Sequence, residues 1–530
     1  MILSLLLAAL AGRGPGPAPV KPKLVVMITV DQLRPDYLVK WKSQLTGGFA
    51  TLQTDGAVFA NAYQDHGVTE TAPGHSTVLS GRWPAHTGII TNTLGVIDST
   101  APLIGVNGPG ASPRRFRGTA FYDWLRAADS SSIALSVSTK DRGAILPIGT
   151  AKQDVYWFFS GVFTTSRYYR DSLPLWVRTF NSQRVPFRAS GKMWKLLLPD
   201  SAYPEPDSVP WENGGVGVTF PHTLPTDSAR AAVAIVATPF MDSLTLALAL
   251  YGADAMLLGR RGHTDLLAVS LSATDYIGHA FGPDSREIHD QVLRLDRTLD
   301  WFLKRLFDRY GRGNVMIVLT ADHGVSSYPE RAVQQGQAGA RGVNIDTLVT
   351  ALNAGLEAAL NPGAPVGTPP RAWFRFDPGI LFLLDNGRIA AAGLNADSVV
   401  RAAQTRIRAA TGIARVDTPA DLARADTVQD PIARRWLHHI APDAGIALVV
   451  TLQDWDVWIL PPPAVNIAEH GQPSDRDAHV PLIMWGKGIK PGSYAPRANT
   501  VDIAPTLARL LGLTPLSLLD GRVLQEALVR

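Results

Sequence analysis

The sequence predicts an α/β protein with a mostly parallel sheet, helices on both faces of that sheet, and two large insertions. Three runs are almost continuously apolar, as is typical of strands buried on both faces: residues 24–30, 266–271 and 315–321. An aspartate follows each run within a few residues: Asp31, Asp275 and Asp322. Ligands of open α/β sheets bind at the carboxyl ends of the strands, so these aspartates predict a functional site at one edge.

The composition of the 530 residues is that of a large globular protein, with 46% hydrophobic and 18% charged residues. A chain of this length predicts one large domain with insertions, or two domains. The formal net charge is +4, and the basic residues form no block. We therefore expect no nucleic-acid partner, although a mildly positive protein attracts anionic substrates.

The amino terminus predicts a signal peptide and leader over residues 1–22. Residues 2–11 are apolar and end in an A-x-A pattern, and a stretch rich in Gly and Pro follows. The apolar run is shorter than the roughly 20 residues that span a bilayer. The chain contains no cysteine, which fits export. We expect a periplasmic or secreted monomer without a stable membrane partner.

One catalytic domain is predicted over residues 23–530, with insertions at about 93–230 and 326–465. The first insertion is rich in Trp, Tyr, Pro and Gly and has weak periodicity, as is typical of a segment that covers an active site. Before the second insertion, the pattern predicts an edge strand near 56–59 and a helix from residue 74. It also predicts helices over 227–252 and 284–310. Asp284 or Ser285 is positioned to cap the last of these helices.

The second insertion has its own mixture of helix and strand patterns. Helices are predicted over 344–360 and 396–411, and strands over 372–376, 380–384 and 456–460. The core then resumes with a strand over 479–485 and closes with a helix over 502–512.

Candidate metal ligands lie at three of the predicted strand ends. Asp275 and His279 are four residues apart and share a face if they lie on one helical turn. Asp322 and His323 are adjacent, so they can serve two ions, and the glycine that follows them frees the turn. His479 is a further candidate, and His470 competes with it for the same role.

A hydroxyl and two cations complete the candidate site. Thr71 precedes a Pro-Gly turn and a predicted helix, where free backbone N–H groups favour an anion. A nearby metal ion can make such a hydroxyl a nucleophile. Lys140 and Arg142 would share one face of an extended segment, and such a pair suits a phosphoryl group.

These motifs together resemble the alkaline phosphatase superfamily. The resemblance rests on Asp31, the Thr71-to-His75 segment, the segment from Gly88 to Asn92, Lys140-Asp-Arg142, Asp275-x-x-x-His279, Asp322-His323-Gly324 and His479-Val-Pro. Within the superfamily the chain most resembles the phosphate-irrepressible, threonine-nucleophile alkaline phosphatases, which are close to the nucleotide pyrophosphatase/phosphodiesterases. The implied fold is an alkaline-phosphatase-like core.

The resemblance implies two zinc ions and a role for each site residue. One ion would be held by Asp31, Thr71, Asp322 and His323, and the other by Asp275, His279 and His479. Thr71 would be the nucleophile, and Asn92, Lys140 and Arg142 would contact the phosphoryl oxygens. His75 follows the motif but is not expected to be a ligand.

The expected function is therefore hydrolysis of small-molecule phosphate monoesters through a phosphothreonine intermediate. A phosphodiesterase or nucleotide pyrophosphatase is the main alternative, but in the resemblance the Lys-x-Arg pair belongs to the monoesterases. Sulfatases are disfavoured because the chain has no Cys and Thr71 is not followed by their Arg, and phosphoglycerate mutases because they use serine. A catalytically inactive binding protein would be expected to lack a ligand or the nucleophile.

Overall fold

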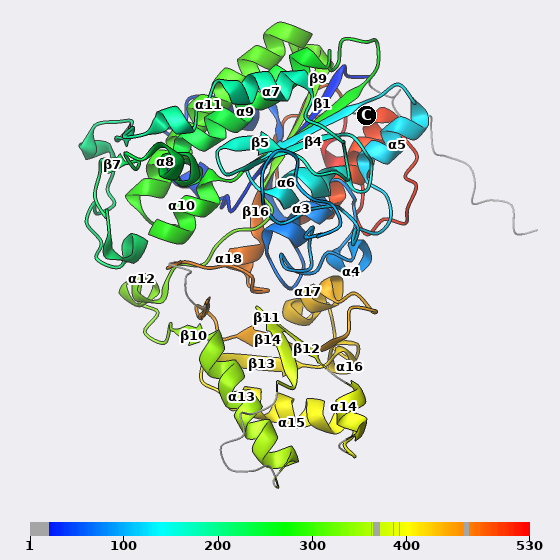
Figure 1. The fold of residues 1–530 in the computed structure, drawn as a ribbon. Coiled ribbons are helices and arrows are strands. Elements are labelled where there is room, and N and C mark those ends of the chain that lie inside the picture. The colour runs from blue at the N-terminus through cyan, green and yellow to red at the C-terminus, as the bar shows by residue number, and fades with distance from the viewer. Residues whose placement is uncertain are drawn as a thin grey trace, which may run out of the picture.

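A ten-stranded, mostly parallel sheet forms the centre of the protein in the computed structural model (Figure 1). The structure describes residues 21–361, 363, 372–384, 386–391, 393–460 and 466–529. The strand order is β17-β2-β16-β9-β1-β8-β3-β4-β5, and β18 also pairs with β2. Residues 1–20 of the predicted signal peptide and leader lie outside the described residues.

The middle of the sheet consists of the strands that the apolar runs predict. β1 (Leu24–Val30) pairs in parallel with both β8 (Asp265–Leu271) and β9 (Val315–Thr320). All seven residues of β1 are buried, and alternate side chains face opposite layers, with Val26 and Ile28 on one side and Val25 and Met27 on the other. The sheet is therefore covered on both faces, as the continuous apolar runs predicted.

Helices cover the two faces of the sheet. On one face lie α2 (Gly48–Asp55), α7 (Leu175–Ser182), α9 (Pro239–Ala255), α10 (Ala273–Phe281) and α11 (Arg286–Tyr310). On the other lie α3 (Thr71–Val78), α5 (Phe121–Ala128), α6 (Asp141–Ile145) and α19 (Ile503–Leu511). Of the two predicted caps for α11, Ser285 is the one whose hydroxyl accepts a hydrogen bond, from the backbone N–H of Ile288.

Two strands, β16 and β5 (Val162–Thr164), run against the parallel core. β16 (His479–Trp485) is antiparallel to both β9 and β2 (Ala57–Tyr63). β2 is not an edge strand as predicted, because β17 (Gly492–Tyr494) and β18 (Ala498–Asn499) pair with its other side. These short strands follow β16 in the sequence, so they could not be anticipated from the pattern around β2.

Part of the first predicted insertion belongs to the main sheet. The range 93–230 supplies β3 (Ala134–Ser138), β4 (Asp154–Phe159) and β5 (Val162–Thr164). The helix predicted over 227–252 is two helices, α8 (Ser228–Ala234) and α9, because Pro239 starts a new helix. Among the described residues no single helix is long and apolar enough to cross a membrane. One pair of helices, Ser228–Ala237 and Pro239–Ala255, has the required length and composition, but it is bent by 90°.

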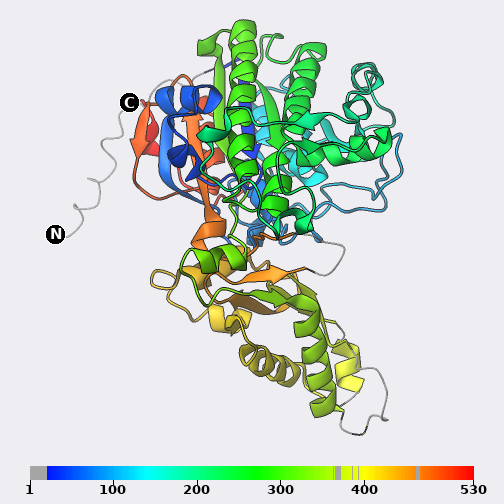
Figure 2. The ribbon, with the colours of Figure 1, turned by 90° about the vertical axis from the view of Figure 1, so that its left-hand side faces the viewer.

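The second insertion folds around a hydrophobic cluster of its own and lies below the main sheet in Figures 1 and 2. We call residues 342–460 the insertion unit. Its four-stranded sheet consists of β11 (Phe374–Asp377), β12 (Ile380–Leu383), β14 (Ile446–Leu452) and β13 (Ile413–Asp417), in that order. β10 (Gly342–Asn344) pairs with β15 (Val457–Ile459), and the helices are α13 (Ile345–Leu360), α14 (Asn386–Ala391), α15 (Ala396–Arg408), α16 (Pro419–Leu422) and α17 (Pro431–His439).

Four further short helices lie outside the insertion unit. They are α1 (Tyr37–Lys40), α4 (Pro84–Thr87), α12 (Pro329–Gln334) and α18 (Asp475–Ala478). The chain leaves the core after β9 to build α12 and the insertion unit, and returns through α18 into β16. We call the two segments that connect the insertion unit to the core its stems. One stem follows the carboxyl end of β9, and the other precedes β16, which pairs with β9.

Candidate active site

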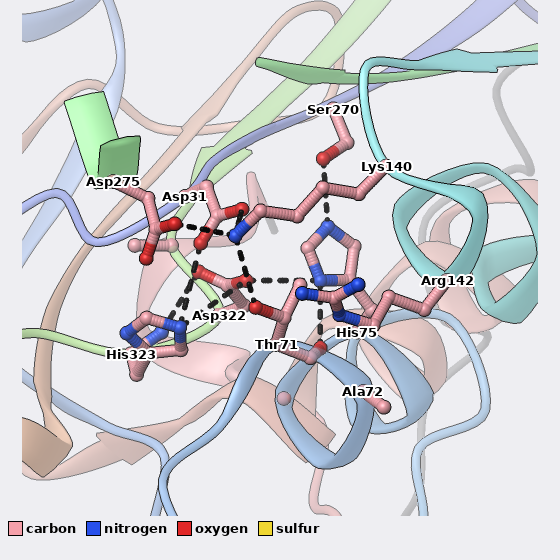
Figure 3. A network of polar contacts seen from close by, with 12 residues as sticks. Asp31, Thr71, Ala72, His75, Lys140, Arg142, Ser270, Asp275, Asp322 and His323 are labelled. Atoms are coloured by element: carbon pink, nitrogen blue, oxygen red, sulfur yellow. Dashed lines mark hydrogen bonds and ion pairs between the residues drawn. The ribbon is translucent and has the colours of Figure 1, made fainter. Parts of the chain in front are cut away.

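Three carboxylates meet at the carboxyl ends of the central strands. Asp31 directly follows β1, Asp322 follows β9, and Asp275 lies in the first turn of α10 after β8; all three are buried. The ammonium group of Lys140 lies between two of them, 2.7 Å from Asp31 Oδ2 and 2.5 Å from Asp275 Oδ2 (Figure 3). The predicted convergence at one sheet edge is therefore present in the structure.

A first group of possible metal ligands consists of Asp31, Asp322 and His323. His323 Nε2 lies 3.4 Å from Asp31 Oδ1 and 3.7 Å from Asp322 Oδ2. Donors that bind one zinc ion tetrahedrally at about 2.0–2.1 Å lie about 3.3–3.4 Å apart. Asp31 Oδ1 and His323 Nε2 are buried and make no hydrogen bond among the described residues, and Asp322 Oδ2 is contacted by His75 at 3.0 Å, so the arrangement fits a shared cation.

A second group consists of Asp275, His279 and His470. His279 Nε2 lies 3.3 Å from Asp275 Oδ1 and 3.2 Å from His470 Nε2, and His470 Nε2 lies 3.6 Å from Asp275 Oδ1. These separations match the edges of a tetrahedral site as well. Glu469 lies beside His279 and His470 and offers a further oxygen ligand.

Backbone carbonyls fix the orientation of all three histidines. Nδ1 of His323 lies 2.9 Å from the carbonyl oxygen of Gly324, that of His279 lies 2.8 Å from Ala468, and that of His470 lies 2.7 Å from Thr69. Because a carbonyl oxygen only accepts, each Nδ1 is the protonated nitrogen. When the ring is neutral, each Nε2 then carries a lone pair that faces the carboxylates, as metal-binding histidines require.

His479 is a correction to the predicted ligand set. It is the first residue of β16, its ring stacks on Tyr63, and its Nε2 lies 2.9 Å from the carbonyl oxygen of Ala60. The alternation of side chains along β16 turns His479 away from the carboxylates. His470, the competing candidate, takes its place.

The hydroxyl of Thr71 lies beside both groups of ligands. Thr71 is the first residue of α3, which begins earlier than predicted, and its Oγ1 accepts a hydrogen bond from Lys140 Nζ at 3.3 Å. α3 approaches the end of β9 so closely that a Cβ at Gly74 would lie 2.1 Å from the carbonyl oxygen of Asp322. Glycine at this position is what lets Thr71 reach the carboxylates.

His75 is fully engaged in hydrogen bonds and offers no free nitrogen. Its Nδ1 lies 2.9 Å from the carbonyl oxygen of Thr71 and 3.0 Å from Asp322 Oδ2, and its Nε2 lies 2.9 Å from the hydroxyl of Ser270. The ring therefore links α3 to β8 and to the residue that follows β9.

Asn92 presents a hydrogen-bond donor next to Thr71. Its Oδ1 accepts a hydrogen bond from the backbone N–H of Ala72 at 2.9 Å. Because that partner can only donate, the side-chain oxygen must face it, and Nδ2 is left for the cleft. The backbone N–H of Asn92 donates to Glu70 Oε2 at 2.7 Å.

Lys140 and Arg142 reach the site in a different way from the one predicted. The segment is not extended: Lys140 caps α6 and Arg142 lies in its first turn. Both line the same cleft as Thr71, and Arg142 Nε makes no hydrogen bond among the described residues. The two cations therefore converge from a helix start instead of from one face of a strand.

The cleft that contains Thr71 has a volume of about 410 Å³. Its walls are formed by Thr71, Asn92, Lys140, Arg142, Asn213, Asp275, Tyr276, His279, Ala280, Asn466 and His470. Asn213, Tyr276 and Asn466 were not predicted. Asn213 and Asn466 come from segments of weak periodicity, and Tyr276 was passed over between the two ligands that flank it.

Gln32 is a further residue that the sequence did not reveal. It has a left-handed backbone with φ of 66°, and its backbone N–H donates to Asp322 Oδ1 at 3.2 Å. Its side-chain Nε2 donates to Asp275 Oδ1 at 3.0 Å. Gln32 thereby orients one carboxylate of each ligand group. Its place directly after Asp31 was the signal that could have identified it.

Burial and charge give the ligands unusual acidities in the absence of bound cations. Burial and the neighbouring charges of Asp275 and Asp322 raise the pKa of Asp31 well above its usual range. Burial lowers the pKa of His323 to about 3, so its ring is neutral. Burial opposes protonation of His279, but the charges of Asp275 and Glu469 raise its pKa to about 9. Such a concentration of buried carboxylates is typical of a cation-binding site.

The fold and this arrangement define a class of protein. The family of type I phosphodiesterases / nucleotide pyrophosphatases matches residues 25–350, more than half of the chain. The chain belongs to this family, within the alkaline phosphatase superfamily.

Named relatives match almost the whole chain. It is 31% identical to alkaline phosphatase PhoV of Synechococcus elongatus, over 96% of this chain and 93% of that protein. It is 32% identical to alkaline phosphatase PafA of Elizabethkingia meningoseptica, over 96% and 95%. The crystal structure of PafA superposes with a TM-score of 0.87 at 30% identity, covering 97% of this chain and 100% of that one. A solved PafA variant is substituted at a threonine, an asparagine, a lysine and an arginine.

Proposed function

We propose that the protein is a phosphomonoesterase that uses Thr71 as its nucleophile and two zinc ions as cofactors. The observation that carries the proposal is the position of the Thr71 hydroxyl. It lies at the start of α3, 3.3 Å from Lys140 Nζ, at the carboxyl ends of the strands that supply both ligand groups. The named relatives are alkaline phosphatases, and phosphate monoesters are the substrate class that follows.

The residues present fit two zinc ions. Asp31, Asp322 and His323, with the Thr71 oxygen, would hold one ion, and Asp275, His279 and His470 the other. Nitrogen and carboxylate donors at these separations suit zinc. When bound, the two ions supply Lewis acidity and lower the pKa of a hydroxyl or a water molecule.

In the proposed transfer of a phosphoryl group, one residue of the chain forms the bond to phosphorus and three others bind the phosphoryl oxygens. The Thr71 hydroxyl gives up its proton to solvent and its oxygen forms a bond to phosphorus, while the bond from phosphorus to the leaving oxygen breaks. The leaving alcohol takes up a proton from solvent. Water then attacks the phosphothreonine, which releases inorganic phosphate and restores the hydroxyl. Asn92 Nδ2, Lys140 and Arg142 bind the non-bridging oxygens, where charge stabilisation counts most.

The two cations favour monoesters over diesters. A monoester presents two negative charges and free non-bridging oxygens to Lys140 and Arg142, whereas the second substituent of a diester occupies part of that region. The PafA variant is substituted at the residue types of Thr71, Asn92, Lys140 and Arg142, and the separations within each of the two pairs are the same in both chains. A phosphodiesterase on the same scaffold remains the second candidate, supported by the family to which the chain belongs.

The test compares kcat/KM for an aryl phosphate with that for the matching diester, in the wild type and in the double variant Lys140→Ala, Arg142→Ala. Each charge-assisted contact contributes about 1.5–3 kcal/mol, so monoester turnover should fall on the order of a hundredfold or more. Diester turnover should fall much less. An equal loss for both substrates, or a wild type that prefers the diester, would make the phosphodiesterase the better assignment.

We further infer that the enzyme is exported and acts as a monomer on small-molecule phosphate esters in the periplasm or outside the cell. The apolar amino terminus and the lack of cysteine support export. Fractionation of cells that express the full chain, followed by activity measurement in each fraction, tests this inference.

A further inference from the structure

The short loop that contains Asn92 is held from two sides. We call residues 90–94 the Asn92 loop. On the side of the nucleophile, Glu70 accepts a hydrogen bond from the backbone N–H of Asn92 at 2.7 Å. On the opposite side, the carboxylate of Asp377 accepts hydrogen bonds from the hydroxyls of Thr91, at 2.9 Å, and Thr93. The residues on both sides of Asn92 are therefore tied to one carboxylate.

That carboxylate comes from the insertion unit. Asp377 is the last residue of β11 and is only 4% exposed. Its contact with Arg375 of its own strand is long, at 3.5 Å, whereas its contacts to the Asn92 loop are short. Asp377 therefore bonds mainly outside the unit that bears it, which a residue needed only for the stability of β11 would not do.

A second element of the insertion unit holds the start of the same loop. His439, at the end of α17, donates from Nε2 to the carbonyl oxygen of Ile90 at 2.6 Å. Ile90 also packs in a hydrophobic cluster with Trp436 of α17 and Ile380 of β12. The loop therefore contacts the insertion unit at three positions, residues 90, 91 and 93.

These contacts between the insertion unit and the Asn92 loop help to determine where the side chain of Asn92 lies. The amide oxygen is fixed by Ala72 at the start of α3, and the Cα of Asn92 is held by Glu70 and by the two threonines that flank it in the loop. Displacement of the loop would draw Nδ2 away from the position of the phosphoryl group. Misplacement of a binding group by about 1 Å can cost on the order of a hundredfold in rate.

We propose that Asp377 is a positioning residue for the phosphoryl-binding Asn92, so that the insertion unit completes the active site by holding the Asn92 loop. The proposal rests on the proposed function of Asn92. It assigns to the insertion unit a role in catalysis in addition to any role as a wall of the cleft. Asp377 acts through Thr91 and Thr93 and does not touch the substrate.

The experiment compares Asp377→Ala with Asp417→Ala as a matched control. Asp417 is also a buried carboxylate at the end of a strand in the same sheet, and it pairs with Arg415 at 2.6 Å. We expect Asp377→Ala to lower kcat/KM for an aryl phosphate about ten- to a hundredfold and to weaken inhibition by inorganic phosphate. Asp417→Ala should stay within about threefold of the wild type in both measurements.

Coupling to Asn92 separates positioning from general stability. In an Asn92→Ala background, Asp377→Ala should change kcat/KM by less than about twofold, because the group that it positions is gone. Thr91→Val combined with Thr93→Val should reproduce the loss seen in Asp377→Ala. Asp377→Asn retains one oxygen acceptor and should recover part of the activity, and it serves as the main variant if Asp377→Ala unfolds.

Two outcomes would overturn the inference, and they differ from failure of the proposed function. Equal losses in Asp377→Ala and Asp417→Ala would show that only the stability of the insertion unit matters. A full effect of Asp377→Ala in the Asn92→Ala background would show that Asp377 acts elsewhere. Failure of the proposed function would appear instead in the wild type, as a lack of aryl phosphate turnover.

Discussion

At the scale of single residues, two histidines of the same segment have opposite environments. His470 Nε2 faces Asp275 and His279, whereas His479 stacks on Tyr63. We expect His470→Ala to lower kcat by at least about a hundredfold and to remove about one equivalent of bound metal, because a ligand is lost. Turnover and metal content after dialysis against a chelator and addition of zinc check this prediction.

His479→Ala is the matched control for this prediction. Its activity should stay within about threefold of the wild type, with unchanged metal content, because its ring contacts Ala60 and Tyr63 of β2 instead of the ligand groups. Loss of activity and metal in His479→Ala, with little effect in His470→Ala, would contradict this prediction. It would mean that His479 is the ligand and that the start of β16 has a different geometry in the active protein.

Of the six Asp and His residues proposed as metal ligands, sequence alone could place five but not the last histidine. Asp31, Asp322 and Asp275 follow apolar runs within a few residues, so the topology of a parallel sheet brings them together. The last histidine follows the insertion unit, where two histidines precede the returning strand. Which of them turns inward depends on the register of β16 against β2, and that register comes from long-range pairing.

At the scale of elements, the position of α3 depends on Gly74. A methyl group there would overlap the carbonyl oxygen of Asp322, and the backbone of β9 cannot yield. Gly74→Ala should therefore lower the free energy of unfolding by about 1–3 kcal/mol and lower kcat, because Thr71 moves with its helix. Urea unfolding and aryl phosphate turnover measure the two effects.

Gly313→Ala provides the control for crowding at Gly74. Nothing lies within 4 Å of a Cβ at that position, and its backbone is not left-handed. It should leave both stability and turnover close to those of the wild type. A stable and fully active Gly74→Ala protein would mean that the approach of α3 to β9 is not required for activity.

Elements were predicted best where the local pattern determined them. β1, β8 and β9 are buried on both faces, so their sequences are continuous apolar runs. The segment from Lys140 to Arg142 was expected to be extended, but a short helix begins there, in contact with β3 and β4. Helices this short depend on tertiary packing more than on their own sequence.

At the scale of the whole molecule, one carboxylate joins the main sheet to the insertion unit. Asp65 lies 2.8 Å from Arg434 and 3.0 Å from Arg435, both on α17, and 2.7 Å from Arg497. Burial would raise the pKa of Asp65, but His438 and these arginines hold it well below its usual range. The depressed pKa means that ionised Asp65 stabilises the folded state above the unfolded pKa of about 3.9.

This linkage predicts a dependence of stability on pH. At pH 7 Asp65→Asn should lower the free energy of unfolding by about 3 kcal/mol, because the arginines lose a buried partner. As the pH falls from about 5 towards 3, Asp65 becomes protonated in the unfolded chain but stays ionised in the folded protein. The free energy of unfolding of the wild type should therefore fall towards that of the variant. Urea unfolding at several pH values gives the difference.

The control for this measurement is Asp171→Asn, a substitution at a fully exposed side chain whose contact with Arg167 is 3.9 Å. It should leave stability nearly unchanged at every pH. A difference between wild type and Asp65→Asn that stays constant from pH 7 to pH 3 would mean that Asp65 is not the group that responds.

The stems of the insertion unit have a consequence for how the chain tolerates changes in length. The chain leaves the core just after His323 and returns just before His470, and the two rings stack with centroids 3.7 Å apart. Residues 324–469 therefore form a segment whose two ends are held together. Doubling the length of such a segment adds only about 0.6 kcal/mol to the entropic cost of bringing its ends together. The far end of the unit can therefore lengthen or shorten cheaply, whereas a single residue gained or lost at either stem would pull the two rings out of register.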